Sequence, residues 1–209
     1  MSATAADKAY KKSANIYKSV PVLIDTNGNK LAAGTDYDKN TVKYRYDART
    51  VVEYKKGKTS ETKERYAGEE VDKNDIIPAG TVIRIELEGK NNYEGTRTIR
   101  YRIVASDLSK GKVTVKTQTY TGNVVMPEGN AKDPAQGDVV VTVGNDVLVY
   151  GVDYKITGYT NNISQGKNKA ALTVQGIGNY GGSKTAKFTI LQKTFLSDIV
   201  SALYKRFMK

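Results

Sequence analysis

Short stretches in which apolar and polar residues alternate run through the first 190 residues and predict β-strands. The two clearest stretches place on one face Ile83, Ile85 and Leu87, and Ile99, Tyr101 and Ile103. Similar β-branched and aromatic runs occupy positions 139–143, 171–174 and 186–190. Turn residues such as Asn27-Gly28 separate the runs, because Asn and Gly tolerate positive φ. The pattern therefore predicts an all-β protein made of small antiparallel β-sandwiches.

The last segment has a different period. Apolar side chains recur at every fourth position, at Phe195, Ile199, Leu203 and Phe207. This spacing predicts a short C-terminal amphipathic helix. We expect the helix to dock on an apolar surface of the second module, of another chain or of a membrane. Lys205 and Arg206 near its end would suit anionic lipid.

Two motifs recur in the same order and indicate a duplicated module. Gly34-Thr-Asp36-Tyr37 matches Gly151-Val-Asp153-Tyr154, and Gly89-Lys-Asn-Asn-Tyr93-Glu-Gly95 matches Gly176-Ile-Gly-Asn-Tyr180-Gly-Gly182. The repeated side chains are predicted to stabilise turns: Asp36, Tyr37 and Tyr93 in the first copy, and Asp153, Tyr154 and Tyr180 in the second. Asp36 and Asp153 would hydrogen-bond nearby backbone, and the rings of Tyr93 and Tyr180 would pack beneath their turns and hydrogen-bond through their hydroxyls.

The spacing of the motifs gives a domain map. The first motif is repeated after 117 positions and the second after 87, so the first copy carries 30 extra residues. Such insertions usually lie on the surface, and this one is expected to be dispensable for folding. The predicted parts are a disordered tail at 1–9, a β-sandwich module at 10–105 with a charged insertion at 43–74, a linker at 106–112, a second module at 113–192 and the helix at 193–209.

Composition limits the chemistry. The chain has no cysteine, histidine or tryptophan, which excludes disulfides, thiolate sites and the Ser-His-Asp and Cys-His arrangements of hydrolases. The acidic cluster Glu69, Glu70, Asp72 and Asp75 lacks EF-hand spacing, so a solvated loop is expected there rather than a metal site. We expect no cofactor and no enzymatic activity.

Charge and tyrosine content leave binding functions open. The net charge is +11, but basic residues are spread along strands and mixed with acids, so nucleic-acid binding is not expected. The chain has 15 tyrosines, whose rings can stack on sugars or pack within strands. The candidate ligand contacts lie in the insertion: Tyr44, Tyr46, Tyr54 and Tyr66.

The spaced motifs resemble a known family. The order Gly-x-Asp-Tyr, then Gly-x-Gly-Asn-Tyr-x-Gly-x-Lys-Thr-x-x-Phe-x-Ile, is similar to tandem immunoglobulin-like repeats in large secreted surface proteins of Gram-positive, often gut-dwelling bacteria. The resemblance covers about residues 10–190. The stretch Asp75-Ile-Ile-Pro-Ala-Gly80 resembles the penultimate module of such proteins. Copy one departs from the pattern by its insertion and by Asn91, where the repeat has Gly178.

The resemblance implies extracellular β-sandwich modules at the C-terminal end of a longer chain, on the cell surface or secreted. It does not imply a ligand. The expected function is a non-enzymatic stalk, adhesion or binding segment of a bacterial surface protein, with an unknown host or bacterial surface glycan or protein as partner. One alternative is an accessory carbohydrate-binding module of a secreted glycan-degrading enzyme. Another is a binder of nucleic acid or of anionic polymers.

Overall fold

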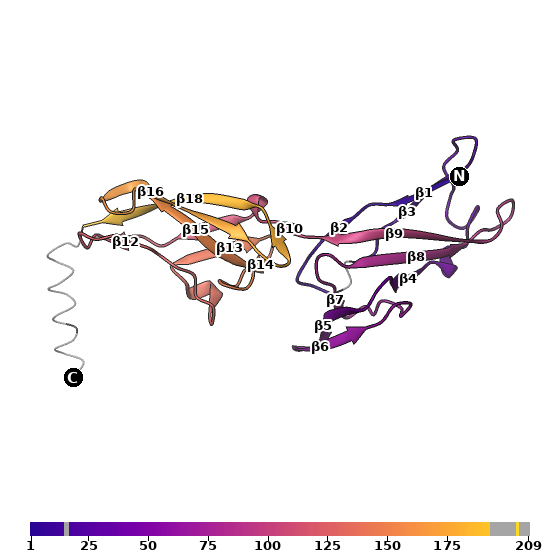
Figure 1. Cartoon of the computed structure of the whole chain (residues 1–209), viewed down its shortest axis with the longest axis horizontal. Helices are drawn as coiled ribbons and strands as arrows, with labels where there is room; N and C mark the ends of the chain where they lie inside the picture. Colours follow the sequence, from indigo (N-terminus) through magenta and orange to yellow (C-terminus); the bar gives the residue numbers. More distant parts are fainter. Residues whose placement is uncertain (15–16, 193–203, 205–209) are drawn as a thin grey trace. The chain divides into compact units, whose positions relative to one another are not determined.

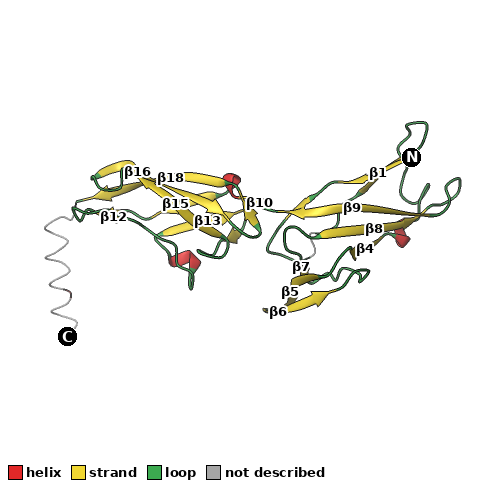
Figure 2. Ribbon diagram, viewed as in Figure 1, coloured by secondary structure: helices red, strands yellow, loops and turns green. Residues whose placement is uncertain are grey.

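The computed structural model shows a mostly β protein that folds as two compact units, Met1–Ser106 (unit 1) and Asp107–Lys209 (unit 2) (Figures 1 and 2). It describes residues 1–14, 17–192 and 204. The helical elements between residues 1 and 192 are three single 3-10 turns, η1 (Lys39–Thr41), η2 (Leu108–Lys110) and η3 (Pro134–Gln136). None of the described helices is long and apolar enough to cross a membrane. The predicted C-terminal helix, with Phe195, Ile199, Leu203 and Phe207, lies outside the described residues.

The described residues of unit 1 form three sheets. Its strands are β1 (Ser2–Ala5), β2 (Lys8–Ala9), β3 (Pro21–Ile24), β4 (Lys43–Tyr46), β5 (Thr50–Lys56), β6 (Thr59–Arg65), β7 (Asp75–Ile76), β8 (Val82–Glu88) and β9 (Thr96–Val104). The strand orders are β1-β3, β2-β9-β8-β4 and β6-β5-β7. Strands β8 and β9 run side by side (Figure 1), with Ile83 opposite Tyr101 and Ile85 opposite Ile99.

The alternation predicted for β8 and β9 is confirmed. Ile83, Ile85 and Leu87 are at most 1% exposed, whereas Arg84 and Glu86 between them are only half-buried. On β9, Ile99, Tyr101 and Ile103 are buried in the same way, and the residues between them are exposed. Because successive side chains of a strand point to opposite faces, these residues form one apolar surface of the sheet and hold the unit together.

Unit 2 contains a three-stranded and a four-stranded sheet. Its elements begin at β10 (Ser106–Asp107), on the boundary of the units, and continue with β11 (Lys112–Val115), β12 (Gln118–Thr119), β13 (Val139–Val143), β14 (Asp146–Val147), β15 (Tyr154–Thr160), β16 (Gly166–Gly176), β17 (Tyr180–Gly181) and β18 (Ser183–Leu191). The strand orders are β11-β13-β14 and β12-β18-β16-β15, and β17 forms a two-stranded sheet with β10. Val139, Val141, Leu172, Val174, Phe188 and Ile190 are at most 1% exposed and make the core.

The same strand path is followed in both units. In unit 1, β1 pairs antiparallel with β3, and β2 then pairs parallel with β9. In unit 2, β11 pairs antiparallel with β13, and β12 then pairs parallel with β18. Ala3 lies opposite Leu23 as Val113 lies opposite Val141. The first strand of each unit therefore switches from one sheet to the other at the same place.

The N-terminal residues are not a tail. The predicted disorder of residues 1–9 is wrong, because Ser2–Ala5 forms β1 and Lys8–Ala9 forms β2. The Asp7 carboxylate between these strands accepts a hydrogen bond from the Arg102 backbone N–H at 2.7 Å. The alternating residues of β1 are alanine and small polar residues, which give a weak hydrophobic signal.

The extra residues of unit 1 are not a separate surface excursion either. Residues 43–46, at the start of the predicted insertion, form β4, which pairs with β8 from Lys43 opposite Glu86 to Tyr46 opposite Ile83. Further along, β5 pairs with both β6 and β7, and Val52 on β5 is 1% exposed. The insertion therefore contributes a core strand and a small sheet with buried side chains.

Candidate functional site

The repeated Gly-x-Asp-Tyr motif builds the same turn in both units. The Asp36 carboxylate accepts a hydrogen bond from the backbone N–H of Ala32 at 2.7 Å, four residues earlier. The Asp153 carboxylate accepts one from the N–H of Val149 at 2.9 Å, also four residues earlier. The preceding glycines have φ of +87° and +81°, a conformation that side chains with a Cβ disfavour.

The tyrosines of this motif, which the sequence predicted only as turn residues, lie in the core. Tyr37 is 6% exposed and Tyr154 is 1% exposed. The Tyr154 hydroxyl donates a hydrogen bond to the Val139 carbonyl at 3.1 Å, and burial raises the pKa of Tyr154 to about 12. Both rings therefore connect the turn to the interior of their unit, which is a structural role.

The second motif is also built alike in the two units. Gly89 N–H donates to Gly95 O, and Gly176 N–H donates to Gly182 O, both at 2.9 Å. An added Cβ at Gly89 or Gly176 would collide with the backbone of Tyr93 or Tyr180. Both loops therefore require glycine at their first position.

The hydroxyls of the two loop tyrosines have matching partners. Tyr93 donates to the Asp25 carboxylate and Tyr180 to that of Asp146, each at 3.3 Å. The rings differ in burial, because Tyr180 is 2% exposed whereas Tyr93 is only half-buried. Sequence analysis predicted the equivalence but not this difference.

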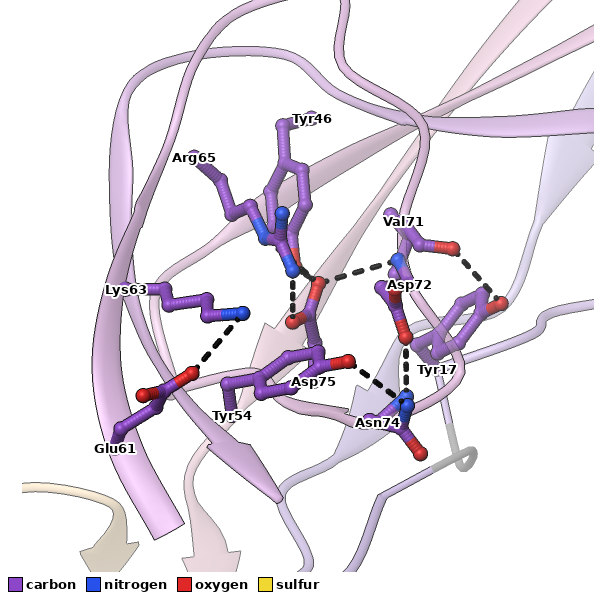
Figure 3. Close-up of polar contacts among 10 residues, drawn as sticks. All are labelled: Tyr17, Tyr46, Tyr54, Glu61, Lys63, Arg65, Val71, Asp72, Asn74 and Asp75. Carbon is purple, nitrogen blue, oxygen red and sulfur yellow. Dashed lines mark hydrogen bonds and ion pairs between the residues drawn. The ribbon is translucent and has the colours of Figure 1, made fainter. Parts of the chain in front are cut away.

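Unit 1 has a buried polar centre at Asp75, which Figure 3 shows among its neighbours. The side chain of Asp75 is fully buried. Its carboxylate accepts hydrogen bonds from the Tyr46 hydroxyl at 2.8 Å, from Arg65 Nε and Nη2 at 3.1 and 2.7 Å, and from the Asp72 backbone N–H at 3.1 Å. A buried carboxylate requires such partners, because an unpaired charge away from water is costly.

The Asp75 centre joins three strands of the insertion region. Tyr46 comes from β4, Arg65 from β6 and Asp75 from β7. Burial and the hydrogen bond to the carboxylate raise the pKa of Tyr46 well above its ordinary value. The hydrogen bond to Asp75 also raises the pKa of Arg65. The prediction of a solvated acidic loop is therefore wrong for Asp75, which is an ion-paired residue of the core.

Next to this centre, Tyr54 on β5 is covered by cations. The Lys63 ammonium lies 3.4 Å from the ring centroid of Tyr54, and the Arg65 guanidinium lies 5.7 Å from it (Figure 3). The Tyr54 hydroxyl accepts a hydrogen bond from the Asn74 side-chain amide at 3.2 Å. Cation–π contact of this kind stabilises a half-exposed ring, and it also occupies the face that a sugar would use.

The four candidate ligand tyrosines do not form one aromatic surface. Tyr46 is 0% exposed, so its prediction as a ligand contact is wrong. Tyr44 is half-buried, packs edge-to-face on Tyr17 at 5.8 Å between centroids, and donates to the Ser19 carbonyl at 3.0 Å. With Tyr54 covered by Lys63, Tyr66 is the member of the four with a largely accessible ring, at 52% exposure.

Tyr66 belongs to an exposed polar cluster with Glu64 and Arg49. Its hydroxyl donates to the Glu64 carboxylate at 2.9 Å, and Arg49 pairs with the same carboxylate through Nε and Nη2. The hydrogen bond to Glu64 raises the pKa of Tyr66, and the one from Arg49 lowers the pKa of Glu64. An aromatic face beside a fixed carboxylate and a guanidinium can contact a polar, ring-shaped ligand.

The described residues contain no group of three or more acidic side chains arranged to hold a metal ion. A scan against models of protein families finds no match to this chain, and a search of curated proteins finds no similar sequence.

Proposed function

We propose that the chain is a pair of immunoglobulin-like repeats from a bacterial extracellular surface protein, and that it serves as a non-enzymatic stalk or adhesion segment. The observation that carries this proposal is the strand switch that both units share. In each unit an early strand leaves one sheet and pairs parallel with the last long strand of the other sheet. The sequence resemblance to tandem immunoglobulin-like repeats supports the same assignment.

This pairing suits a segment that bears tension. In unit 1, Lys8 pairs with Ile103 and Ala9 with Val104, and the Tyr10 N–H donates to the Val104 carbonyl at 2.8 Å. In unit 2, Gln118 and Thr119 pair with Ile190 and Leu191 in the same way. A force applied to the two ends of a unit pulls such parallel strands in opposite directions along their axes. Their hydrogen bonds must then break together rather than one at a time.

Single-molecule force spectroscopy tests this function. The chain contains no cysteine, so handles can be attached through Lys112→Cys with Gln192→Cys, at two exposed positions of unit 2, the start of β11 and the residue after β18. The matched control places handles at Lys167→Cys and Leu191→Cys, which peel β16 from β18 at one end of the hairpin. We expect the first pair to unfold at a several-fold higher force. Equal forces for the two pairs would contradict the stalk function.

The second candidate is glycan binding, and the Tyr66, Glu64 and Arg49 cluster favours it. Tyr66 directly follows β6, the outer strand of the sheet that unit 1 has in addition to the shared module, where a specific contact would be placed without disturbing the repeat. A glycan array with the parent chain, Tyr66→Ala and the control Tyr120→Ala tests it, since Tyr120 is an exposed tyrosine of unit 2. A signal that Tyr66→Ala removes and Tyr120→Ala keeps would support a carbohydrate-binding module.

A further inference from the structure

Unit 1 has an open apolar socket at the end of its sandwich. The cavity has a volume of about 240 Å³ and is lined by Leu23, Leu31, Tyr37, Leu87, Tyr93 and Arg97, with Met1 at its border. Leu23, Leu31, Tyr37 and Leu87 are buried core residues, so the floor of the socket is the core of the unit. This volume is several times that of one water molecule, which takes up about 30 Å³ in the liquid.

The corresponding place in unit 2 is filled. The strand registers align Ala3 with Val113 and Lys8 with Gln118, an offset of 110 residues along the first strands of the two units. By this offset Met1 corresponds to Gly111. Residues 107–110 of unit 2 thus lie ahead of the stretch that this offset aligns between the two units. These residues form η2, which packs against β13, β17 and β18.

Leu108 fills the core at this place in unit 2. It is 0% exposed and lies in η2, whose contact strands match the walls of the socket. Val141 on β13 corresponds to Leu23, and Tyr180 on β17 corresponds to Tyr93. The greater burial of Tyr180 than of Tyr93 agrees with the presence of η2 beside it.

Two polar contacts also match. Lys184, which corresponds to Arg97, donates from Nζ to the carbonyls of Ser109 at 3.1 Å and Gly111 at 2.5 Å. An added Cβ at Gly182 would lie 2.8 Å from Asp107 Oδ1, whereas one at the equivalent Gly95 would meet nothing within 4 Å. The socket of unit 1 therefore has an apolar wall, a cation and a glycine with free space beside it. In unit 2 the corresponding groups contact the segment Asp107–Gly111.

We propose that this socket is a docking site for a linker of the type Asp107–Gly111, joined ahead of Ser2, whose leucine enters the cavity as Leu108 does in unit 2. In unit 2 this segment comes directly before β11. Asp107 prepares the segment for docking, because its carboxylate accepts a hydrogen bond from the Ser109 N–H at 2.9 Å and fixes the turn.

The test is a graft in the full chain. A copy of residues 104–111 is inserted between Met1 and Ser2, and the matched control carries Leu108→Ala in the grafted copy only. Calorimetry is expected to show the unit 1 transition raised by about 5–10 °C with the leucine graft, and by much less with the control. Hydrogen exchange of residues 89–97 should slow only with the leucine graft, and methyl resonances of Leu23 and Leu87 should shift. Equal melting and exchange for both grafts would overturn the proposal.

The native segment provides the reciprocal measurement. Leu108→Ala in the parent chain should lower the unit 2 transition by about 5–15 °C and speed exchange at residues 176–184, while unit 1 stays unchanged. The exposed Val147→Ala serves as a control for loss of apolar surface within the same unit. A Leu108→Ala variant that melts like Val147→Ala would show that the segment does not close the repeat and would overturn the proposed docking site.

Discussion

Units 1 and 2 share the two repeated turn motifs and the same strand path, but they differ in the additional segments that complete each fold. Unit 2 buries Leu108 and Tyr180 at the end where unit 1 has an open socket beside Tyr93. Unit 1 instead has the β6-β5-β7 sheet and the Asp75 centre, where unit 2 connects β15 to β16 by a short turn. The shared turns and strand path thus set the fold. The differences show where a repeat can be altered: in the segment before its first strand, and in the connection that is the β15–β16 turn in unit 2 and the β6-β5-β7 sheet in unit 1.

The largest effect is expected from alkaline pH, which should separate the units. Burial raises the pKa of Tyr154 to about 12 and that of Tyr101 further still, from an ordinary value of 10.0. A raised folded-state pKa gives stability that is fully present below pH 10 and is lost as pH rises through the folded value. In unit 1, ionised Tyr46 would also face the Asp75 carboxylate.

The pKa values of Tyr46 and Tyr101 in unit 1 are raised further than that of Tyr154 in unit 2, so ionisation of these tyrosines costs unit 1 more stability. We therefore expect unit 1 to unfold first, between about pH 10 and 12, with unit 2 unfolding at higher pH. Tyrosinate absorbance at 295 nm, followed with circular dichroism, checks this. Because the buried hydroxyls ionise only when their unit opens, absorbance and loss of β signal should rise together. Tyrosines that all titrate near pH 10 with an unchanged β signal would contradict the burial described for Tyr46, Tyr101 and Tyr154.

The Asp75 centre should be the most sensitive single site of unit 1. Asp75→Ala removes the partner of both Tyr46 and Arg65, and losing one member of a buried pair costs about 3–5 kcal/mol. Tyr46→Phe, which keeps the ring and the Arg65 pair, should cost about 1–2 kcal/mol. Urea unfolding of each variant measures both. Equal costs for the two variants would show that the ion pair with Arg65 contributes little.

The sequence alone predicted the strands and turns that the two units share, because the patterns that indicate them are local. The alternation of β8 and β9 and the Asp and Gly positions of both motifs are set by residues a few places apart. The Asp75 centre was not predictable in this way, because Tyr46, Arg65 and Asp75 come from three strands and meet only in the folded unit. Their charge and polarity suggested a solvated surface.

Leu108 was missed for a different reason. A lone leucine among Ser, Lys and Gly suggests a linker, and its burial depends on the repeat that follows it. One signal was available: Ala3-Thr-Ala5 and Val113-Thr-Val115 alternate alike at the offset of 110 that both first strands share. Matching these weak strands would have assigned the residues before Lys112 to the second repeat.

The two loop tyrosines provide a direct comparison of the open and closed ends. Tyr180→Ala should destabilise unit 2 by about 3–4 kcal/mol, because the ring is 2% exposed. Tyr93→Ala should cost about 1–2 kcal/mol, since its ring is half-buried beside the socket and much of that surface is already in contact with water. Chemical unfolding monitored separately for each unit checks the pair. A Tyr93→Ala cost as large as that of Tyr180→Ala would show that the socket is closed in solution.

The smallest effect is expected at Asn91 and Gly178, where the two repeats differ in residue but not in backbone. Their φ values are +57° and +62°, so both lie in the left-handed region that Gly and Asn adopt most easily. The Asn91 side chain also donates to the Thr35 carbonyl at 2.7 Å, which offsets part of the conformational cost. Asn91→Gly and Gly178→Asn should therefore each change stability by less than about 0.5 kcal/mol.

The alanine variants are the controls for this exchange. An added Cβ at Gly178 would lie 3.7 Å from the Val152 carbonyl oxygen, an ordinary contact, so the cost of Gly178→Ala is conformational and amounts to about 1 kcal/mol. Asn91→Ala should cost slightly more, because it also loses the hydrogen bond to Thr35. If Gly178→Asn proved as costly as Gly178→Ala, backbone conformation alone would not explain why one repeat has asparagine and the other glycine.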